Sequence, residues 1–140
     1  MINSWNFAGF SLANTGDIES GVLRIFRDSL RPPPDHVLTT VVEPAADKLR
    51  LFQERMAQEK AQGIELDCKI QTLQDYQSAA ENQAARFHFI SSVHSIYYVP
   101  DLKASLKDLY ERLEPNGLMM IIQLSGRLII KTHHHIHIYR

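Results

Sequence analysis

The sequence contains few of the features that would crosslink it or place it in a membrane. It has one cysteine, Cys68, so no disulfide can form within the chain. No window approaches the roughly 20 consecutive apolar residues that a membrane-spanning helix needs. The N-terminus lacks the basic segment and long apolar run of a secretory signal. These absences predict a soluble protein of the reducing cytoplasm that does not bind membranes.

The sequence also lacks an excess of charge of either sign. It carries 15 Lys and Arg residues against 16 Asp and Glu residues. Balanced charge does not favour nucleic acid or an acidic surface, so we expect a small or neutral partner. A length of 140 residues with 44% apolar and 22% charged side chains is typical of one globular domain. We expect that domain to be a monomer.

Helical and extended patterns alternate along most of the chain. The expected elements are a helix over 16–30, a strand over 37–43, a helix over 44–62, a strand over 64–70, a weak helix or loop over 72–86, a strand from 87, a helix over 101–117 and a strand over 118–126. This alternation predicts an α/β fold with three αβα layers and a mostly parallel sheet. Residues 1–15 show neither period, so they predict a poorly ordered arm.

Glu43 stands at the end of a predicted buried strand, directly before a helix that begins near Pro44. In open parallel sheets, ligands bind beyond the carboxyl ends of the strands. An ionised carboxylate there can accept two hydrogen bonds from a ribose diol. The alternative is that Glu43 caps the helix that follows it. This residue alone favours neither interpretation.

Two blocks of the sequence resemble a known family. The segment VVEPAADKLRLFQERM over 41–56 and the segment over 87–126, which contains YYVPD and LMMIIQLSG, are similar to the histamine N-methyltransferase family of class I S-adenosylmethionine-dependent methyltransferases. LQDYQS over 73–78 adds to the similarity. The resemblance implies a Rossmann-like domain over 16–126, S-adenosyl-L-methionine as the cofactor and methylation of a small amine or imidazole. Residues 127–140 resemble nothing in the family and are expected to form a separate tail.

The resemblance implies a cofactor site and a substrate site. The implied cofactor residues are Gly16, Glu43, Thr72, Leu73 and Val93. The implied substrate residues are His94, Tyr97 and Tyr98. Leu73 replaces the usual serine, and His94 replaces a glutamine of the histamine-methylating members. From the residue types alone, the alternatives are a structural histidine and tyrosines at the edge of the core.

The N-terminal part departs most from the family. Class I methyltransferases begin with an apolar strand and a glycine-rich turn, because residues without a Cβ let the backbone approach the cofactor. Here FAGFSLANTGDIE ends in Gly16 followed by the acid Asp17, but the preceding glycines of the turn are absent. The sequence therefore predicts a missing or replaced central strand and a domain that is incomplete relative to the family. Activity is expected to be impaired.

Two other functions fit parts of the sequence. One is a non-catalytic partial domain that acts as a binding or interaction module. The other is a dinucleotide-dependent oxidoreductase, which is disfavoured because no G-x-G-x-x-G precedes the helix at Gly16. The run HHHIH over 133–137 lacks a neighbouring acid or cysteine that would complete a tetrahedral site, so we expect a biased tail and no metal. Cys68 is expected to be a small buried residue.

Overall fold

Seven strands form one sheet in the order β3-β2-β1-β4-β5-β6-β7. The computed structural model describes residues 4–10, 16–60, 62–93 and 99–122, and the backbone of 128–132 and 136–139. The strands are β1 (Ser4–Phe10), β2 (His36–Val42), β3 (Ile64–Lys69), β4 (Phe87–Val93), β5 (Leu113–Ile122), β6 (Leu128–Thr132) and β7 (Ile136–Tyr139). β1 to β5 pair in parallel, whereas β6 and β7 pair antiparallel at one side of the sheet.

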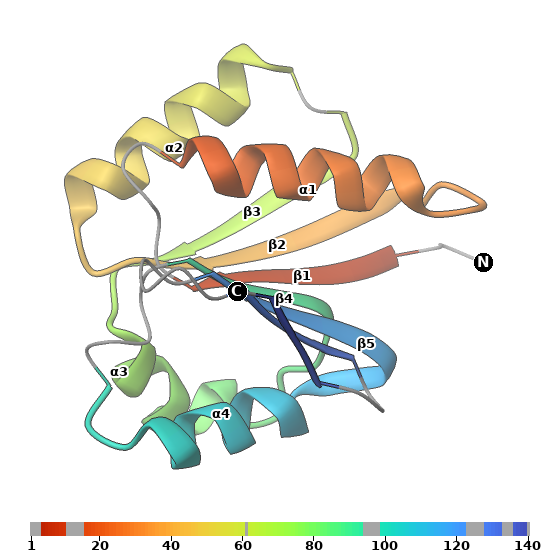
Figure 1. Ribbon diagram of the computed structural model, residues 1–140. Coiled ribbons are helices and arrows are strands. Elements are labelled where there is room, and N and C mark those ends of the chain that lie inside the picture. The colour runs from red at the N-terminus through yellow and green to blue at the C-terminus, as the bar shows by residue number, and fades with distance from the viewer. Residues whose placement is uncertain are drawn as a thin grey trace.

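Helices cover both faces of the sheet. The helices are α1 (Asp17–Ser29), α2 (Ala46–Gln58), α3 (Leu73–Ser78) and α4 (Leu102–Glu111), with a 3-10 turn η1 (Ala80–Asn82). α1 and α2 lie on one face, and α3 and α4 lie on the other (Figure 1). This arrangement confirms the predicted three-layer, mostly parallel fold. None of the helices in the described ranges is both long and apolar enough to cross a membrane.

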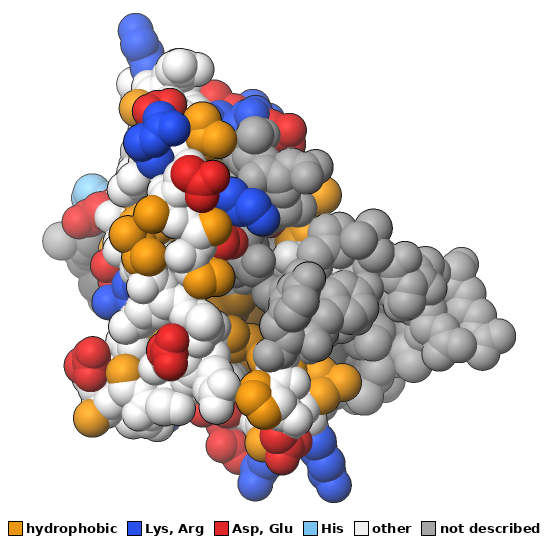
Figure 2. All heavy atoms as spheres, turned by 90° about the vertical axis from the view of Figure 1, so that its left-hand side faces the viewer, with side chains coloured by type: hydrophobic (Ala, Val, Ile, Leu, Met, Phe, Trp, Pro, Cys, Tyr) orange, Lys and Arg blue, Asp and Glu red, His pale blue; other side chains and the backbone are white. Residues whose placement is uncertain are grey.

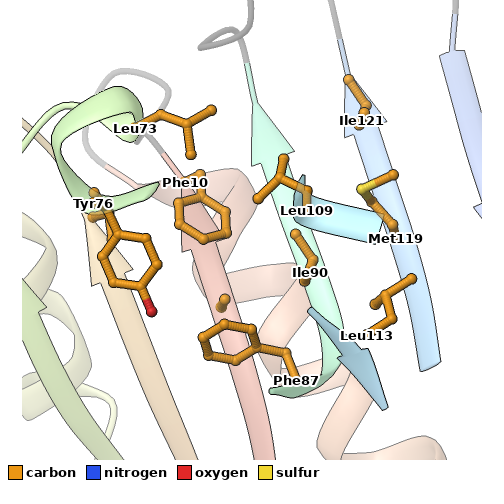
Figure 3. Packing of buried hydrophobic residues seen from close by; sticks show 11 residues of the cluster. Phe10, Leu73, Tyr76, Phe87, Ile90, Leu109, Leu113, Met119 and Ile121 are labelled. Carbon is orange, nitrogen blue, oxygen red and sulfur yellow. The ribbon is translucent and has the colours of Figure 1, made fainter. Parts of the chain in front are cut away.

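Each face of the sheet has its own apolar core. On the α1 and α2 face the buried residues are Phe7, Leu23, Val37, Val41, Leu49, Phe52, Met56 and Phe89. On the α3 and α4 face they are Ala8, Phe10, Val42, Leu73, Tyr76, Phe87, Ile90, Leu109, Leu113, Met119 and Ile121 (Figure 3). Neighbouring residues of one strand appear in different clusters because successive side chains of a strand point to opposite faces.

The N-terminal segment corrects the sequence prediction. Residues 4–10 are not part of a poorly ordered arm, and the central strand is not missing, because β1 occupies the middle of the sheet between β2 and β4. Phe7, Ala8 and Phe10 are each at most 1% exposed. Residues 7–10 of β1 are buried in succession, and such a short buried run does not show the alternation that identifies half-buried strands.

The boundary between α4 and β5 also differs from expectation. The helix was expected to run to Gly117, but α4 ends at Glu111 and β5 begins at Leu113. The register with β4 moves from Phe87↔Leu113 to Phe89↔Leu118, so β5 bulges between these pairs. Asn116 in this bulge has a φ of 65°. The Pro and Gly residues that were assigned to the end of the helix therefore shape an irregular strand.

Candidate functional site

The order of the strands reverses between β1 and β4. From β1 the chain goes to β2 and β3 on one side, and β4 and β5 follow on the other. Adjacent crossovers that leave in opposite directions open a crevice at the carboxyl ends of the two strands, where parallel α/β sheets bind ligands. Figure 2 views the molecule from this edge, where acidic, basic and hydrophobic side chains are intermixed. The sequence-predicted cofactor residues that the structure describes lie at or just beyond this edge.

Glu43 directly follows the last residue of β2 and is 2% exposed. Its backbone N–H donates to the carbonyl of Lys69 at the end of β3, at 3.1 Å. Its carboxylate Oε1 accepts a hydrogen bond from the backbone N–H of Ala45, the N-cap of α2, at 2.8 Å. The capping contact that the sequence left open is therefore present. A carboxylate offers about four acceptor sites, so this contact is compatible with further hydrogen bonds to a ribose.

Gly16 is required by the fold itself. It is the N-cap of α1 with a φ of 78°, in the left-handed region that favours glycine. A Cβ at this position would lie 2.5 Å from Cδ2 of Phe52 in α2. Asp17, the next residue, forms an ion pair with Arg55 of α2. Gly16 thus lets the start of α1 approach α2 at the carboxyl edge of the sheet.

Thr72 is the N-cap of α3 and Leu73 is its first residue, shortly after the end of β3 at Lys69. Oγ1 of Thr72 accepts from the backbone N–H of Asp75 at 3.1 Å and donates to the Asp75 carboxylate at 2.8 Å. Leu73 is 8% exposed and packs in the cluster that contains Phe10 and Tyr76 (Figure 3). Thr72 therefore caps the helix, and Leu73 places an apolar side chain beside the end of β1.

Val93 is the last residue of β4 and is fully buried. The preceding Ser91 and Ser92 are each 1% exposed, and Ser91 is paired with Gly9 of the central strand. Within the described ranges the hydroxyls of Ser91 and Thr39 are buried without a hydrogen-bond partner. None of Ser91, Ser92 and Thr39 was among the predicted site residues, although two serines in a mostly apolar strand such as β4 could have indicated a polar site.

The remaining predicted site residues are not placed. His94, Tyr97 and Tyr98 fall in 94–98, outside the described residues, as does the glycine-poor segment 11–15. Among the residues that are described, no group of three His, Cys, Asp or Glu side chains could hold a metal ion. Cys68 is half-buried, and burial raises the pKa of its thiol.

Arg112 fixes the short helix that carries Thr72 and Leu73. It is 2% exposed and donates to both carboxylate oxygens of Asp108, at 2.7 and 3.2 Å. It also donates to the carbonyls of Asn82 and Gln77, and its guanidinium lies 5.5 Å from the ring centroid of Tyr76. Burial raises the pKa of Tyr76, and the charge of Arg112 opposes this rise. One buried cation thus connects α4 to α3 and η1.

Comparison with protein families identifies the domain. The family model described as "Methyltransferase domain" matches residues 39–137. The chain belongs to the methyltransferase-domain family. The match includes Glu43, Thr72, Leu73 and Val93, and it extends past residue 126, where the sequence resemblance was placed to end.

Curated relatives confirm the more specific resemblance. Histamine N-methyltransferase of Xenopus tropicalis is 30% identical over 115 residues, which cover 80% of this chain and 39% of that protein. The enzyme of Bos taurus is 30% identical over 97 residues, which cover 67% of this chain and 33% of that protein. The chain therefore spans between a third and two fifths of the length of these relatives.

Solved methyltransferase structures have the same fold. Coclaurine N-methyltransferase bound to N-methylheliamine and SAH superposes with a TM-score of 0.60 at 11% identity, covering 86% of this chain and 31% of that chain. A putative sarcosine dimethylglycine methyltransferase from Galdieria sulphuraria gives a TM-score of 0.58 at 17% identity, covering 84% and 38%. At these identities the likeness shows the fold alone, and it confirms the Rossmann-like prediction.

Proposed function

We propose that this domain binds S-adenosyl-L-methionine at the carboxyl ends of β1, β2 and β4, as the donor-binding part of a methyltransferase. The observation that supports the proposal most strongly is Glu43, a nearly buried carboxylate at the end of an interior parallel strand. It lies next to the point where the strand order reverses, which is where a ribose diol would meet it. Membership of the methyltransferase-domain family supports the same cofactor.

The chain's own side chains fit parts of this cofactor. Glu43 would accept hydrogen bonds from the ribose hydroxyls. Leu73 and Val93 would contribute apolar surface against the adenine and the donor, and the first turn of α1 after Gly16 would approach its amino-acid part. When bound, the donor supplies the methyl group of its sulfonium. Displacement by a neutral nitrogen needs alignment and exclusion of water more than a general base, so the reaction does not require a catalytic triad.

The proposed substrate is a small amine or imidazole, as the printed names of the histamine N-methyltransferase relatives suggest. The residues proposed to contact it are His94, Tyr97 and Tyr98, which the resemblance implies and which follow Val93, the last residue of β4, in the sequence. A tyrosine ring face can attract a cationic amine. We further propose that the protein acts as a monomer in the cytoplasm.

Isothermal titration calorimetry with S-adenosyl-L-methionine tests the proposal. We expect saturable binding by the wild-type chain and an affinity at least tenfold weaker for Glu43→Gln, because charge-assisted hydrogen bonds contribute about 1.5 to 3 kcal/mol. Glutamine keeps an acceptor for the N–H of Ala45, so the cap of α2 is preserved. The matched control is Glu54→Gln, which changes an exposed carboxylate of α2 and should bind like wild type. Unchanged affinity in Glu43→Gln would contradict the proposed ribose contact.

A second candidate function is a non-catalytic partial domain that acts as a binding or interaction module. It is supported by the segment SLANT over 11–15, which has no glycine where the family has a glycine-rich turn. A side chain at these positions keeps the backbone away from a ligand. Absence of any heat at millimolar donor, with a folded wild-type chain, would favour this second function.

A further inference from the structure

The beginning of the central strand is held to β4 by a side chain. The backbone ladder between β1 and β4 covers residues 7–10 of β1, from Phe7↔Phe89 to Phe10↔Ser92. One residue earlier, the backbone N–H of Asn6 donates to Nδ1 of His88 at 3.0 Å. The imidazole thus supplies the acceptor that a strand carbonyl supplies elsewhere in a sheet. Loss of this acceptor would remove the hydrogen bond between the backbone of Asn6 and β4.

His88 also contacts the residues around the start of β1. The register between β4 and β5 shifts between Phe87 and Phe89, so His88 lies at an irregularity of the ladder. The ring of His88 packs on Trp5, with their ring centroids 4.4 Å apart. The ring centroids of Trp5 and Phe26 of α1 lie 5.9 Å apart. The contact therefore joins β4, the start of β1 and α1.

The hydrogen bond requires a neutral imidazole. Nδ1 accepts the N–H of Asn6 only through its lone pair, so the ring proton must be on Nε2. A protonated imidazole has two N–H donors and no acceptor. Protonation would place one N–H against another at the Asn6 contact and would remove the acceptor.

We propose that His88 is an acid-sensitive latch whose protonation releases the start of the central strand, while the ladder over 7–10 stays paired. The device is separate from the proposed cofactor site, because Asn6 lies toward the amino end of β1 and the cofactor edge lies at its carboxyl end. Protonation of His88 would thus control whether the start of β1, the central strand, is held in place.

The surroundings of His88 set the direction of the pH dependence. Burial lowers the pKa of His88 below the ordinary 6.5, and the carboxylate of Glu114 in β5 opposes this shift. β1 and α1 present the uncharged Asn6, Trp5 and Phe26. Because the folded pKa is lowered, the latch is fully stabilising above pH 6.5 and is lost as the pH falls from that value through the folded pKa.

Arg86 is another charged residue close to His88 in the sequence. Arg86 is bonded through its guanidinium to the carbonyls of Gln83 and Ala85, at 3.0 and 2.9 Å. Its own carbonyl accepts from the side-chain amide of Asn6 at 3.2 Å. This second contact does not titrate, so Asn6 keeps a hydrogen bond to the residue just before β4 when the latch opens. We therefore expect local loosening rather than detachment of β1.

The test uses the full chain between pH 8 and pH 5. Amide hydrogen exchange of Asn6, measured by NMR and corrected for the intrinsic pH dependence of exchange, should lose protection with a midpoint below 6.5. The amides of Ala8 and Phe10 should stay protected over the same range. Trp5 is the single tryptophan, so its fluorescence should report the same transition. Protection of Asn6 that does not change with pH would overturn the proposal.

Two substitutions separate titration from packing. His88→Asn places an amide oxygen near the position of Nδ1 and does not titrate, so it should keep protection at Asn6 and abolish the acid transition. His88→Leu removes the acceptor and should leave Asn6 unprotected at every pH. His36→Gln, at the exposed start of β2, is the matched control and should retain the transition. An unchanged acid transition in His88→Asn would overturn the proposal even if His88→Leu does not fold.

Discussion

The two helical layers are attached to the sheet by different means. α1 and α2 have 13 residues each; α2 buries Leu49, Phe52 and Met56, and α1 buries Leu23 together with Glu19 and Ser20. α3 has only 6 residues. Its layer is crosslinked by polar contacts, because Arg112 bonds to Asn82 and Gln77, and the side chain of Gln77 exchanges two hydrogen bonds with Ser105.

The difference follows from helix length. Two long amphipathic helices bury enough apolar surface to hold their positions, whereas a helix of under two turns does not. The α3 layer also leaves an open hollow of about 540 Å³, whose lining includes Thr40, Asp67 and Tyr76. Hydrogen bonds from one buried guanidinium add to the apolar contacts that α3 makes through Leu73 and Tyr76. The α3 layer should therefore depend on the chemistry of one residue, and the α1 and α2 layer on volume.

The largest expected effect is in the apolar layer. Phe52 is 1% exposed, so Phe52→Ala should lower the free energy of unfolding by about 4 kcal/mol through loss of burial and the cavity left behind. Phe52→Leu, which keeps most of the volume, should lose about 1.5 kcal/mol or less. Urea unfolding followed by circular dichroism measures both. Leu51→Ala, at a position 37% exposed on the same helix, is the control and should change stability by about 0.5 kcal/mol. Equal losses for Ala and Leu at position 52 would contradict a layer governed by volume.

The next effect tests the polar layer. Arg112→Met should lower the free energy of unfolding by about 3 kcal/mol, because it leaves the carbonyls of Asn82 and Gln77 and the carboxylate of Asp108 without this donor. Arg112→Lys should recover little of that loss, since an ammonium cannot reproduce the planar set of N–H donors. The same urea titration measures these variants.

The control for Arg112 is Arg50→Met. Arg50 forms an exposed pair with Glu54 at 2.6 Å, and such pairs contribute about 0.5 kcal/mol. If Arg112→Lys were as stable as wild type, the two layers would not differ in their dependence on side-chain chemistry.

The sequence predicted the parts of the fold that have a clear period. The amphipathic pattern that ends before RPPPDH matches α1, and the β-branched run before Glu43 matches β2. β1 was missed because a strand buried on both faces has no alternation. The role of Arg112 depends on contacts with residues up to 35 positions away, which no local pattern reveals.

The cofactor site itself stays a prediction, and the structure shows only where some of its residues lie. Glu43 was selected because it stands at the end of a predicted strand, and the structure places it there, 2% exposed. The sequence also selected Gly16 and Thr72, but the structure shows that each has a local structural role: Gly16 allows close packing, and Thr72 caps a helix. Sequence motifs cannot separate such roles from cofactor contacts, because both place the same residue at the same turn.

The smallest of the three effects separates these roles at Gly16. Gly16→Ala should lower the free energy of unfolding by about 2 kcal/mol in the absence of any cofactor, because a φ of 78° disfavours residues with a Cβ and the new methyl group would meet the ring of Phe52. Gly21→Ala is the matched control, since a Cβ there meets nothing within 4 Å in the middle of α1. It should stabilise the protein by about 0.5 to 1 kcal/mol. Combining Gly16→Ala with Phe52→Leu should cost less than the sum of the two single changes, because the smaller side chain makes room for the methyl group. Strict additivity in thermal or urea unfolding would show that the backbone angle alone requires glycine, and that the packing of α1 on α2 at this point does not.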